Sequence, residues 1–474
     1  MQFFLVREIT ALLVGTEFVI FLVIVAYFSG YSVGYALADL LSLRIVRIFT
    51  IIFWAVHLTL PFSLRYWMGS VAVRLPSTAF IIMIFFTTFA VTSLYSLLLP
   101  KLIDLSAQGS NSLGKFYGVE LMGAITGLAV VFFLGSISWI PQVLYQAALA
   151  AIVAMILGGT QIRIVAGAVA LIYGLFFTTL EFNSLAYHYT KFHGLSESKV
   201  LYSVNSPYQK VDIVESKNGK RYMYLDGKKN YGTMSLKLFN IFLSQTPANL
   251  VQPENALALG AGSMESVKYI GSVANRLRIV DIDNAVPEGS KLHFKYTNHF
   301  DEYDNWTLTI EDAKSFLNKT NEYFDLITVD IPMPLQIQTG LLHSVEFYQM
   351  AKNRLSPDGV ISISLSGSFN KRNKTPRTVA AALTQVFEEV IIHTPDIAKR
   401  SFAIAGRKLP FTKEQLVDET IHLGANRTKV YNKTEALNII DGIAPITIYD
   451  LSYPLERSIR KVKKSYFGKR KSGK

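Results

Sequence analysis

The sequence predicts an α-helical transmembrane bundle followed by an α/β domain, in which a small β-hairpin subdomain precedes a doubly wound sheet. Three observations predict this. Hydrophobic residues make up 50% of the 474 residues and charged residues only 17%, below the roughly 25% usual in soluble chains. Residues 1–190 contain only 8 Lys/Arg and 6 Asp/Glu. After residue 198, short apolar runs alternate with helical patterns, which favours strands and helices in turn.

The predicted transmembrane domain covers residues 1–190. About 20 apolar residues in a helix cross the ~30 Å hydrocarbon core of a bilayer, and we expect five to seven spans, with six favoured. The six apolar stretches are Ile9–Phe28, Val46–Pro61, Thr78–Leu99, Tyr117–Leu134, Val143–Leu157 and Ile164–Leu180. The first contains one charge, Glu17. Because spans follow it, we interpret it as a retained anchor of a multi-pass protein of the cell (inner) membrane.

The predicted hairpin subdomain covers residues 198–232. Pro207–Val214 and Arg221–Leu225 have strand composition, and Asn218-Gly219 between them is a hairpin turn signal. Residues 233–409 are predicted to form the sheet domain, residues 410–456 an extension without an assigned role, and residues 457–474 a basic tail. The seven strands predicted for the sheet are Asn255–Leu259, Leu277–Val280, Trp306–Ile310, Phe324–Val329, Val360–Leu365, Val390–His393 and Phe402–Ala405.

Candidate site residues follow the first three of these strands. Ligands of doubly wound sheets bind outside the carboxyl ends of the strands. Gly260 and Gly262 allow the backbone to approach a ligand, and Ser263 is predicted to cap the next helix. Asp281 can accept hydrogen bonds from ribose hydroxyls, and Asp312 from an adenine amino group. Together they indicate an adenosyl group, whereas the alternative is that the aspartates only cap loops and helices.

Asp330 follows the fourth strand, where the transferred group of a donor would be expected. A carboxylate at this position can accept a proton from an attacking amine, so we predict that it is a general base. The alternative is a structural turn before Pro332.

The soluble half resembles the spermidine synthase (polyamine aminopropyltransferase) family over roughly Ser203–Lys408. The matching segments are Ser206–Gln209, Leu225–Gly227, Gly260–Gly262, Asp281–Asp283, Asp312, Phe324–Asp330, Glu346–Tyr348 and Leu355–Val360. The membrane half is similar to the multi-span domain that precedes such modules in some bacterial proteins. The resemblance implies a Rossmann-like sheet of the S-adenosylmethionine methyltransferase type. It also implies that decarboxylated S-adenosylmethionine gives its aminopropyl group to an amine such as putrescine. No metal takes part.

The same resemblance implies a role for each matching residue. Gln209 would line the nucleoside pocket, Asp281 would hold the ribose, Asp312 the adenine, and Asp330 would act as the base. Gly260, Gly262 and Ser263 would form the loop beside the donor.

Several positions depart from the family pattern in ways that affect the acceptor. Ser263 stands where an acid is usual, Asn230 replaces a glutamine, and Met333 replaces a second acid. These changes remove charge that would bind a cationic amine. Three functions therefore stay open: an aminopropyl transferase with an atypical acceptor site, a methyltransferase that uses S-adenosylmethionine itself, and a non-catalytic nucleoside- or polyamine-sensing or regulatory membrane protein.

The charge distribution predicts the partners. Arg457–Lys474 contains nine cations and no acid, and such a tail beside a membrane is attracted to anionic headgroups by roughly 1 kcal/mol per basic residue. The alternative is a solvated end. Residues 191–456 are almost neutral, with 30 Lys/Arg and 29 Asp/Glu, which argues against nucleic acid as a partner. A homo-oligomer is expected. The positive-inside rule weakly favours the opposite orientation, but a domain that binds a cytosolic nucleoside is expected in the cytoplasm.

Overall fold

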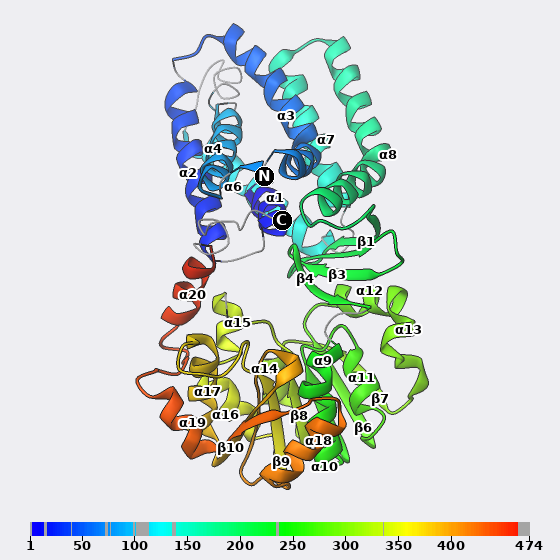
Figure 1. Ribbon diagram of the computed structural model, residues 1–474. Coiled ribbons are helices and arrows are strands. Elements are labelled where there is room, and N and C mark those ends of the chain that lie inside the picture. The colour runs from blue at the N-terminus through cyan, green and yellow to red at the C-terminus, as the bar shows by residue number, and fades with distance from the viewer. Residues whose placement is uncertain are drawn as a thin grey trace. The chain divides into compact units, whose positions relative to one another are not determined.

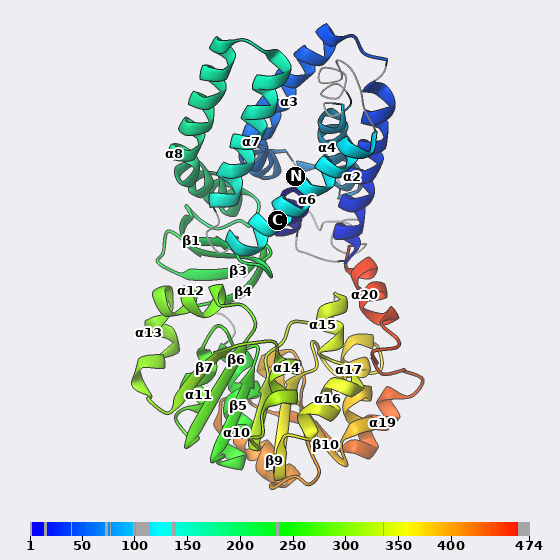
Figure 2. The same cartoon turned by 180° about the vertical axis from the view of Figure 1, so that it is seen from behind.

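The computed structural model describes residues 2–13, 17–38, 40–71, 74–75, 77–97, 100, 113–134, 139–233, 237–334 and 336–462. The chain divides into two compact units, which we call the N-terminal unit (residues 1–230 and 461–474) and the C-terminal unit (residues 231–460). Each is described by itself below, and the chain is traced in Figures 1 and 2.

The N-terminal unit is built mainly of long apolar helices, coloured blue to cyan in Figure 1. They are α1 (Gln2–Leu13), α2 (Glu17–Ala38), α3 (Leu43–Ser70), α4 (Ser77–Ser96), α6 (Leu113–Leu134), α7 (Trp139–Leu157) and α8 (Thr160–Lys191). Four of them, α2, α3, α7 and α8, are long and apolar enough to cross a membrane. Two shorter apolar segments, Ile81–Ser96 and Glu120–Leu134, lie within α4 and α6.

The prediction of one span over Ile9–Phe28 is wrong. Helix α1 ends at Leu13 and α2 begins at Glu17, so the apolar stretch is shared between two helices. Glu17 therefore lies in the first turn of α2. A carboxylate is favourable there because the helix dipole is positive at the N-terminal end. The position also explains why an acid is tolerated inside the apolar stretch.

A buried ion cluster joins three helices of the N-terminal unit to its sheet. Arg65 on α3 lies 2.8 Å from Glu8 on α1 and 2.5 Å from Glu181 on α8. Glu181 also accepts from Lys210 Nζ at 2.7 Å, and Lys210 belongs to strand β2. Arg65 is 0% and Lys210 1% exposed. Because buried charges are stable only when paired, these four residues fix the helices and the strand to one another.

The small sheet that follows α8 has four antiparallel strands in the order β1-β2-β3-β4. They are β1 (Lys199–Asn205), β2 (Lys210–Glu215), β3 (Arg221–Leu225) and β4 (Lys228–Gly232), and the boundary between the two units falls within β4. The predicted hairpin is confirmed, because β2 pairs with β3 across Asn218-Gly219. Gly219 has a φ of +74° there, which glycine adopts without strain.

The C-terminal unit contains a mixed sheet of eight strands in the order β12-β10-β11-β9-β8-β5-β6-β7. The five strands from β9 to β7 are parallel, and β11, β10 and β12 add antiparallel pairs. The strands are β5 (Asn255–Leu259), β6 (Arg276–Asp281), β7 (Trp306–Ile310), β8 (Phe324–Val329), β9 (Leu355–Ser364), β10 (Glu389–Pro395), β11 (Phe402–Gly406) and β12 (Thr428–Tyr431). All seven predicted strands are present, and the α/β fold class is confirmed.

Helices cover both faces of this sheet. The helices that follow β4 are α9 (Lys237–Asn240), the π-helix η2 (Ile241–Gln245), α10 (Thr246–Val251), α11 (Glu265–Ile270), α12 (Ala285–His293), α13 (Lys295–Asn298), α14 (Ala313–Lys319), α15 (Ile337–Leu341), α16 (Val345–Lys352), α17 (Lys374–Val386), α18 (Lys413–His422), α19 (Lys433–Ile440) and α20 (Ser452–Val462). Short 3-10 turns are η3 (Phe300–Glu302) and η4 (Asp396–Ala398).

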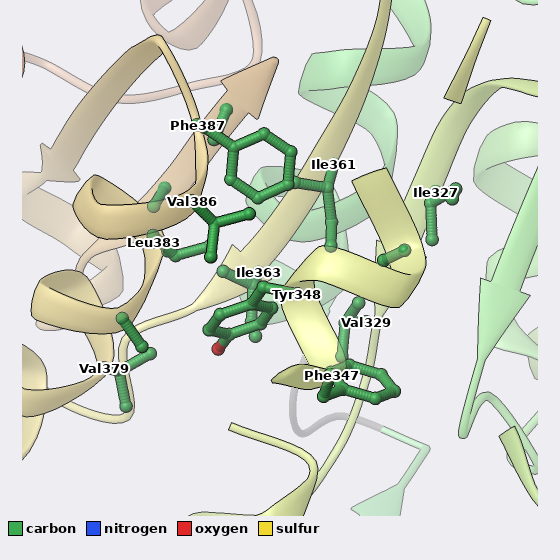
Figure 3. Packing of buried hydrophobic residues seen from close by; sticks show 14 of the residues in the cluster. Ile327, Val329, Phe347, Tyr348, Ile361, Ile363, Val379, Leu383, Val386 and Phe387 are labelled. Atoms are coloured by element: carbon green, nitrogen blue, oxygen red, sulfur yellow. The ribbon is translucent and has the colours of Figure 1, made fainter. Parts of the chain in front are cut away.

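Alternating side chains of the strands form two hydrophobic cores. Leu257 and Leu259 of β5 lie in the larger core with residues of α14, α16, α17 and α19. Ala256 and Ala258 point to the opposite face, in the core with residues of α10, α11 and α18. This alternation follows from the two-residue period of a strand. Figure 3 shows part of the larger core, where the Tyr348 ring lies between Ile363 and α17 and the Phe347 ring lies beside Val329.

The segment 410–456 completes this unit. It contributes β12, which pairs antiparallel with β10, and the helices α18 and α19. Buried Leu416 of α18 lies in one core and buried Ala436 of α19 in the other. The segment is therefore part of the packed domain.

Candidate functional site

The site begins with the loop after β5, where two glycines are required by close approach. Gly260 has a φ of +73°, and a Cβ there would lie 2.6 Å from the Asp330 carbonyl oxygen. A Cβ at Gly262 would lie 2.5 Å from Asp281 Oδ2. Both distances are too short for a side chain. The loop therefore brings the ends of β5, β6 and β8 together, as expected for neighbouring strands of a parallel sheet.

The prediction that Ser263 caps the next helix is wrong. Met264, with a φ of +60°, occupies the cap position of α11, and no side chain caps the helix. The main-chain oxygen of Ser263 instead accepts hydrogen bonds from Ser290 Oγ at 2.8 Å and from Asn298. The Asn298 amide in turn accepts from the Tyr231 hydroxyl. These contacts fix the glycine loop from the side of α12 and α13.

Asp281 is the last residue of β6 and is buried, with 9% exposure. Its Oδ1 atom accepts from the Asp283 amide at 2.9 Å, which orients the carboxylate. Burial raises its pKa to about 6, against the opposing effect of the Asp283 hydrogen bond. At neutral pH most of the Asp281 carboxylate is charged. Its Oδ2 atom lies beside Gly262.

Asp312 caps a helix, as the alternative interpretation expected, whereas Asp283 forms a turn just before one, whose cap position is Asn284. Asp283 Oδ1 accepts from the amide of Ala285, the first residue of α12, at 3.1 Å. Asp312 Oδ1 accepts from the amides of Lys314 and Ser315 at 3.1 and 3.0 Å, at the start of α14. The second carboxylate oxygen of Asp312 has no protein partner among the described residues. Capping and a contact with adenine are therefore compatible for Asp312.

Asp330 directly follows β8, and its amide donates to the Leu259 carbonyl at 2.8 Å. Burial raises the pKa of its carboxyl group to about 7, and the negative charges of Glu265 and Asp281 raise it further, while Arg400 opposes them. A carboxyl group with a pKa near neutrality can both accept and release a proton. Groups with such shifted pKa values gather at functional sites.

Glu265 is a site residue that the sequence pattern missed. It stands where a dinucleotide fold would have a third glycine, it is 4% exposed, and its Oε2 atom accepts from the Asn240 side chain. Burial is the largest cause of the raised pKa values of Asp330, Tyr231 and Tyr269. The negative charge of Glu265 raises all three further. The signal was an acid in place of glycine after the loop. The family has an acid at the position of Ser263, and this chain has one two residues later, at Glu265.

Two further residues shape the surroundings of Asp330. Arg400, on the loop before β11, is half-buried, and its guanidinium lies over the Phe239 ring at 5.1 Å. Buried His343 lies 3.0 Å from the Pro332 carbonyl through Nε2 and 3.2 Å from the Tyr348 hydroxyl through Nδ1. Burial lowers the His343 pKa to about 4, so the neutral ring donates from Nε2 and accepts at Nδ1. This pair of bonds fixes the loop after Asp330.

The structure thus brings Gly260, Gly262, Asp281 and Asp330 together, with Asp312 at the end of the next strand. Gln209 lies in the N-terminal unit, in the turn before β2, and its contact with a nucleoside stays a prediction. Among the described residues, no group of three His, Cys, Asp or Glu side chains is placed to hold a metal ion.

Comparison with known proteins gives relatives of one kind. Residues 242–399 match the spermine/spermidine synthase domain. Polyamine aminopropyltransferase 2 of Aquifex aeolicus is 28% identical over 255 residues, which are 52% of this chain and 50% of the relative. The polyamine aminopropyltransferase of Thermoplasma volcanium is 26% identical over 200 residues, 42% of this chain and 72% of the relative.

The shared part does not extend over the whole chain. The chain spans about half the length of the first relative and 47% of the similar enzyme from Oceanobacillus iheyensis. A solved spermidine synthase from Thermotoga maritima covers 51% of this chain and 84% of its own, with 20% identity and a TM-score of 0.41. Residues 242–399 therefore carry a spermine/spermidine synthase domain, and this part of the chain is similar to the polyamine aminopropyltransferases.

Proposed function

We propose that this protein is a membrane-anchored transferase that moves an aminopropyl group from decarboxylated S-adenosylmethionine to an amine. The observation that carries the proposal is the acid cluster of Glu265, Asp281 and Asp330 around the glycine loop of a spermine/spermidine synthase domain. The relatives of this domain are named polyamine aminopropyltransferases. Their activity is what we propose for this chain.

In the proposed reaction the nitrogen of a neutral amine attacks the methylene carbon beside the sulfonium of the donor. The new C–N bond forms as the C–S bond breaks, and the sulfur leaves as a neutral thioether, 5′-methylthioadenosine. The proton lost from the amine passes to the Asp330 carboxylate. A base with a pKa of about 7 is matched to this task, because it is largely ionised just above neutral pH and still basic enough to accept the proton.

The charge of the site favours the decarboxylated donor over S-adenosylmethionine. The amine and sulfonium of the decarboxylated donor are both cationic, and the acids near Asp330 attract them. The carboxylate of S-adenosylmethionine would instead meet Glu265, buried beside the loop. A like charge in a poorly solvated site is strongly unfavourable. The replacement of the acid at position 263 by serine is therefore offset by Glu265.

The location and partners belong to the same proposal. Four helices of sufficient length and apolarity support a multi-pass protein of the cell membrane, and use of a cytosolic nucleoside supports a cytoplasmic synthase domain. We further propose a homo-oligomer with a small amine as the acceptor. We also propose that the basic tail 457–474 meets anionic headgroups; its residues 457–462 belong to α20, and residues 463–474 lie outside the described residues.

The decisive test uses purified full-length protein in detergent. Labelled decarboxylated S-adenosylmethionine is incubated with putrescine, spermidine and other amines, and transfer is followed by chromatography. Calorimetry measures binding of the donor, of S-adenosylmethionine and of 5′-methylthioadenosine. We expect transfer to at least one amine and tighter binding of the decarboxylated donor. Tighter binding of S-adenosylmethionine would favour a methyltransferase, and binding without transfer a sensing protein.

A further inference from the structure

A polar cavity lies in the C-terminal unit, and none of the acid-cluster residues Glu265, Asp281 and Asp330 lines it. Its volume is about 220 Å³. One wall is the loop between β9 and α17 with the first turn of that helix, and the other wall is α20. Tyr453 holds the walls together, since its hydroxyl donates to Thr375 Oγ1 at 2.6 Å in a buried contact. The cavity is therefore built by packed elements.

The lining of this cavity is strongly basic. Arg372 and Lys374 come from the loop and α17, and Arg457 and Arg460 from α20, against one acid, Glu456. Glu456 is already shared by two of the cations: Lys374 Nζ lies 2.6 Å from Oε2, and Arg460 contacts Oε1. Four positive charges therefore surround the cavity with one negative charge.

Two of the arginines have no protein partner for their guanidinium groups in the part of the chain that the structure describes. Arg457 Nε is inaccessible to solvent and makes no hydrogen bond. Arg372 is exposed at the rim, and only its main-chain amide is bonded, to Asn370. A buried unpaired donor destabilises a fold. An anion in the cavity would remove this cost and relieve the repulsion between like charges.

The N-terminal end of α17 points to the same kind of ligand. The helix has 13 residues and no acid in its first turn, and the Asn373 side chain does not cap it. The Asn373 amide donates instead to the Ser368 carbonyl at 2.8 Å. The amides of Lys374 and Thr375, the two N–H groups before Pro376, are therefore left without a side-chain acceptor. Free amides and the positive end of a helix dipole favour anions, phosphate groups above all.

We propose that this cavity binds a phosphate-type anion, either a phosphate or diphosphate group in solution or the phosphate of a lipid headgroup. Arginine forks and helix amides suit the tetrahedral oxygens of phosphate. A cationic amine would be repelled by the same lining. The cavity is therefore a separate site from the acid cluster at Asp330, and its ligand is neither donor nor acceptor of the proposed reaction.

The test uses the full-length protein in dodecyl maltoside, a detergent without phosphate, with inorganic pyrophosphate as the probe and calorimetry as the readout. We expect saturable binding that weakens about tenfold in Arg457→Gln and in Arg372→Gln, since one charge-assisted hydrogen bond is worth about this much. Arg372 is exposed, so its variant should fold normally. The matched control is Lys371→Gln, which removes a neighbouring exposed charge outside the cavity and should leave affinity nearly unchanged.

A second arm identifies the source of the phosphate. The same titration is repeated in nanodiscs that contain phosphatidic acid. Loss of pyrophosphate binding in the presence of phosphatidic acid identifies a lipid headgroup as the occupant. Unchanged pyrophosphate binding identifies a soluble phosphate. Absence of saturable pyrophosphate binding in the phosphate-free detergent would overturn the proposal, as would equal loss in the Lys371→Gln control. Neither result depends on aminopropyl transfer.

Discussion

Asp281 Oδ2 occupies the space in which a side chain would begin at Gly262, 2.5 Å from the position of a Cβ. Gly262→Ala must therefore displace either the loop or the carboxylate proposed to hold the ribose. We expect 5′-methylthioadenosine to bind about tenfold or more weakly, equivalent to at least 1.4 kcal/mol, as measured by calorimetry. Gly167→Ala is the control, because no heavy atom lies within 4 Å of a Cβ there. Unchanged affinity in Gly262→Ala would contradict the placement of the ribose.

Asp330→Asn removes the proposed base while keeping the shape of the side chain. We expect kcat to fall by about 10²–10⁴-fold, the usual contribution of a general base, with little change in donor affinity. Steady-state kinetics with the best amine acceptor measure both quantities. Asp358→Asn is the matched control, since Asp358 is exposed at the opposite, amino-terminal end of the sheet. Full activity of Asp330→Asn would refute the role of the base.

The raised pKa of Asp330 also predicts how stability depends on pH. The folded-state value of about 7 lies above the ordinary 3.8, so the folded protein binds more protons than the unfolded chain between these pH values. Stability from this group is therefore present at pH 4 and is lost as the pH rises through 7. Asp330→Asn should melt above the wild type at pH 8, and the difference should vanish near pH 4. Thermal unfolding at several pH values measures this, and a variant that is less stable at pH 8 would contradict it.

Glu265→Gln tests whether this acid serves the donor. Loss of its charge should raise the KM for decarboxylated S-adenosylmethionine by about tenfold, if one charge-assisted contact is lost. Affinity for 5′-methylthioadenosine, which lacks the amine, should hardly change. Because Glu265 raises the Asp330 pKa, the midpoint of the pH–rate profile should move to lower pH. Glu414→Gln, on the exposed start of α18, is the control. An unchanged midpoint in Glu265→Gln would show that Glu265 does not affect the Asp330 pKa.

Strand positions could be predicted from the sequence because they depend on local pattern. The apolar runs at Asn255–Leu259 and Phe324–Val329 become β5 and β8 at the predicted bounds. Their order in the sheet then places Asp281 and Asp330 at one edge. β12 was missed because Thr428–Tyr431 is short and half polar, and its pairing with β10 is a long-range contact.

Side-chain partnerships were harder to predict than strands. Ser263 has the composition of a helix cap, yet Met264 takes the left-handed conformation and the helix starts one residue later. Arg400 approaches Asp330 from a loop far along the chain, which no spacing rule anticipates. Glu265 was visible only as a departure from a glycine pattern. Its importance came from burial and from its effect on Asp330.

Arg65→Met leaves Glu8 and Glu181 without the guanidinium that both contact. We expect destabilisation of about 3–5 kcal/mol, the usual result of removing one partner from a buried ion pair. The double variant Arg65→Met/Glu181→Met should recover part of this loss, because fewer unpaired charges remain. Thermal or denaturant unfolding in detergent measures both, and a single variant as stable as the wild type would show that the cluster contributes nothing.

The contact between Lys210 and Glu181 affects how a fragment without the apolar helices would fold. Lys210 is the first residue of β2, directly after Gln209, whereas Glu8 and Glu181 belong to the apolar helices. A truncated protein that starts at residue 198 would lack Glu8 and Glu181, the two glutamates that pair with the buried Lys210 ammonium. The apolar helices therefore stabilise β2 by pairing its buried lysine, and a soluble fragment would need a substitution such as Lys210→Met before it could fold alone.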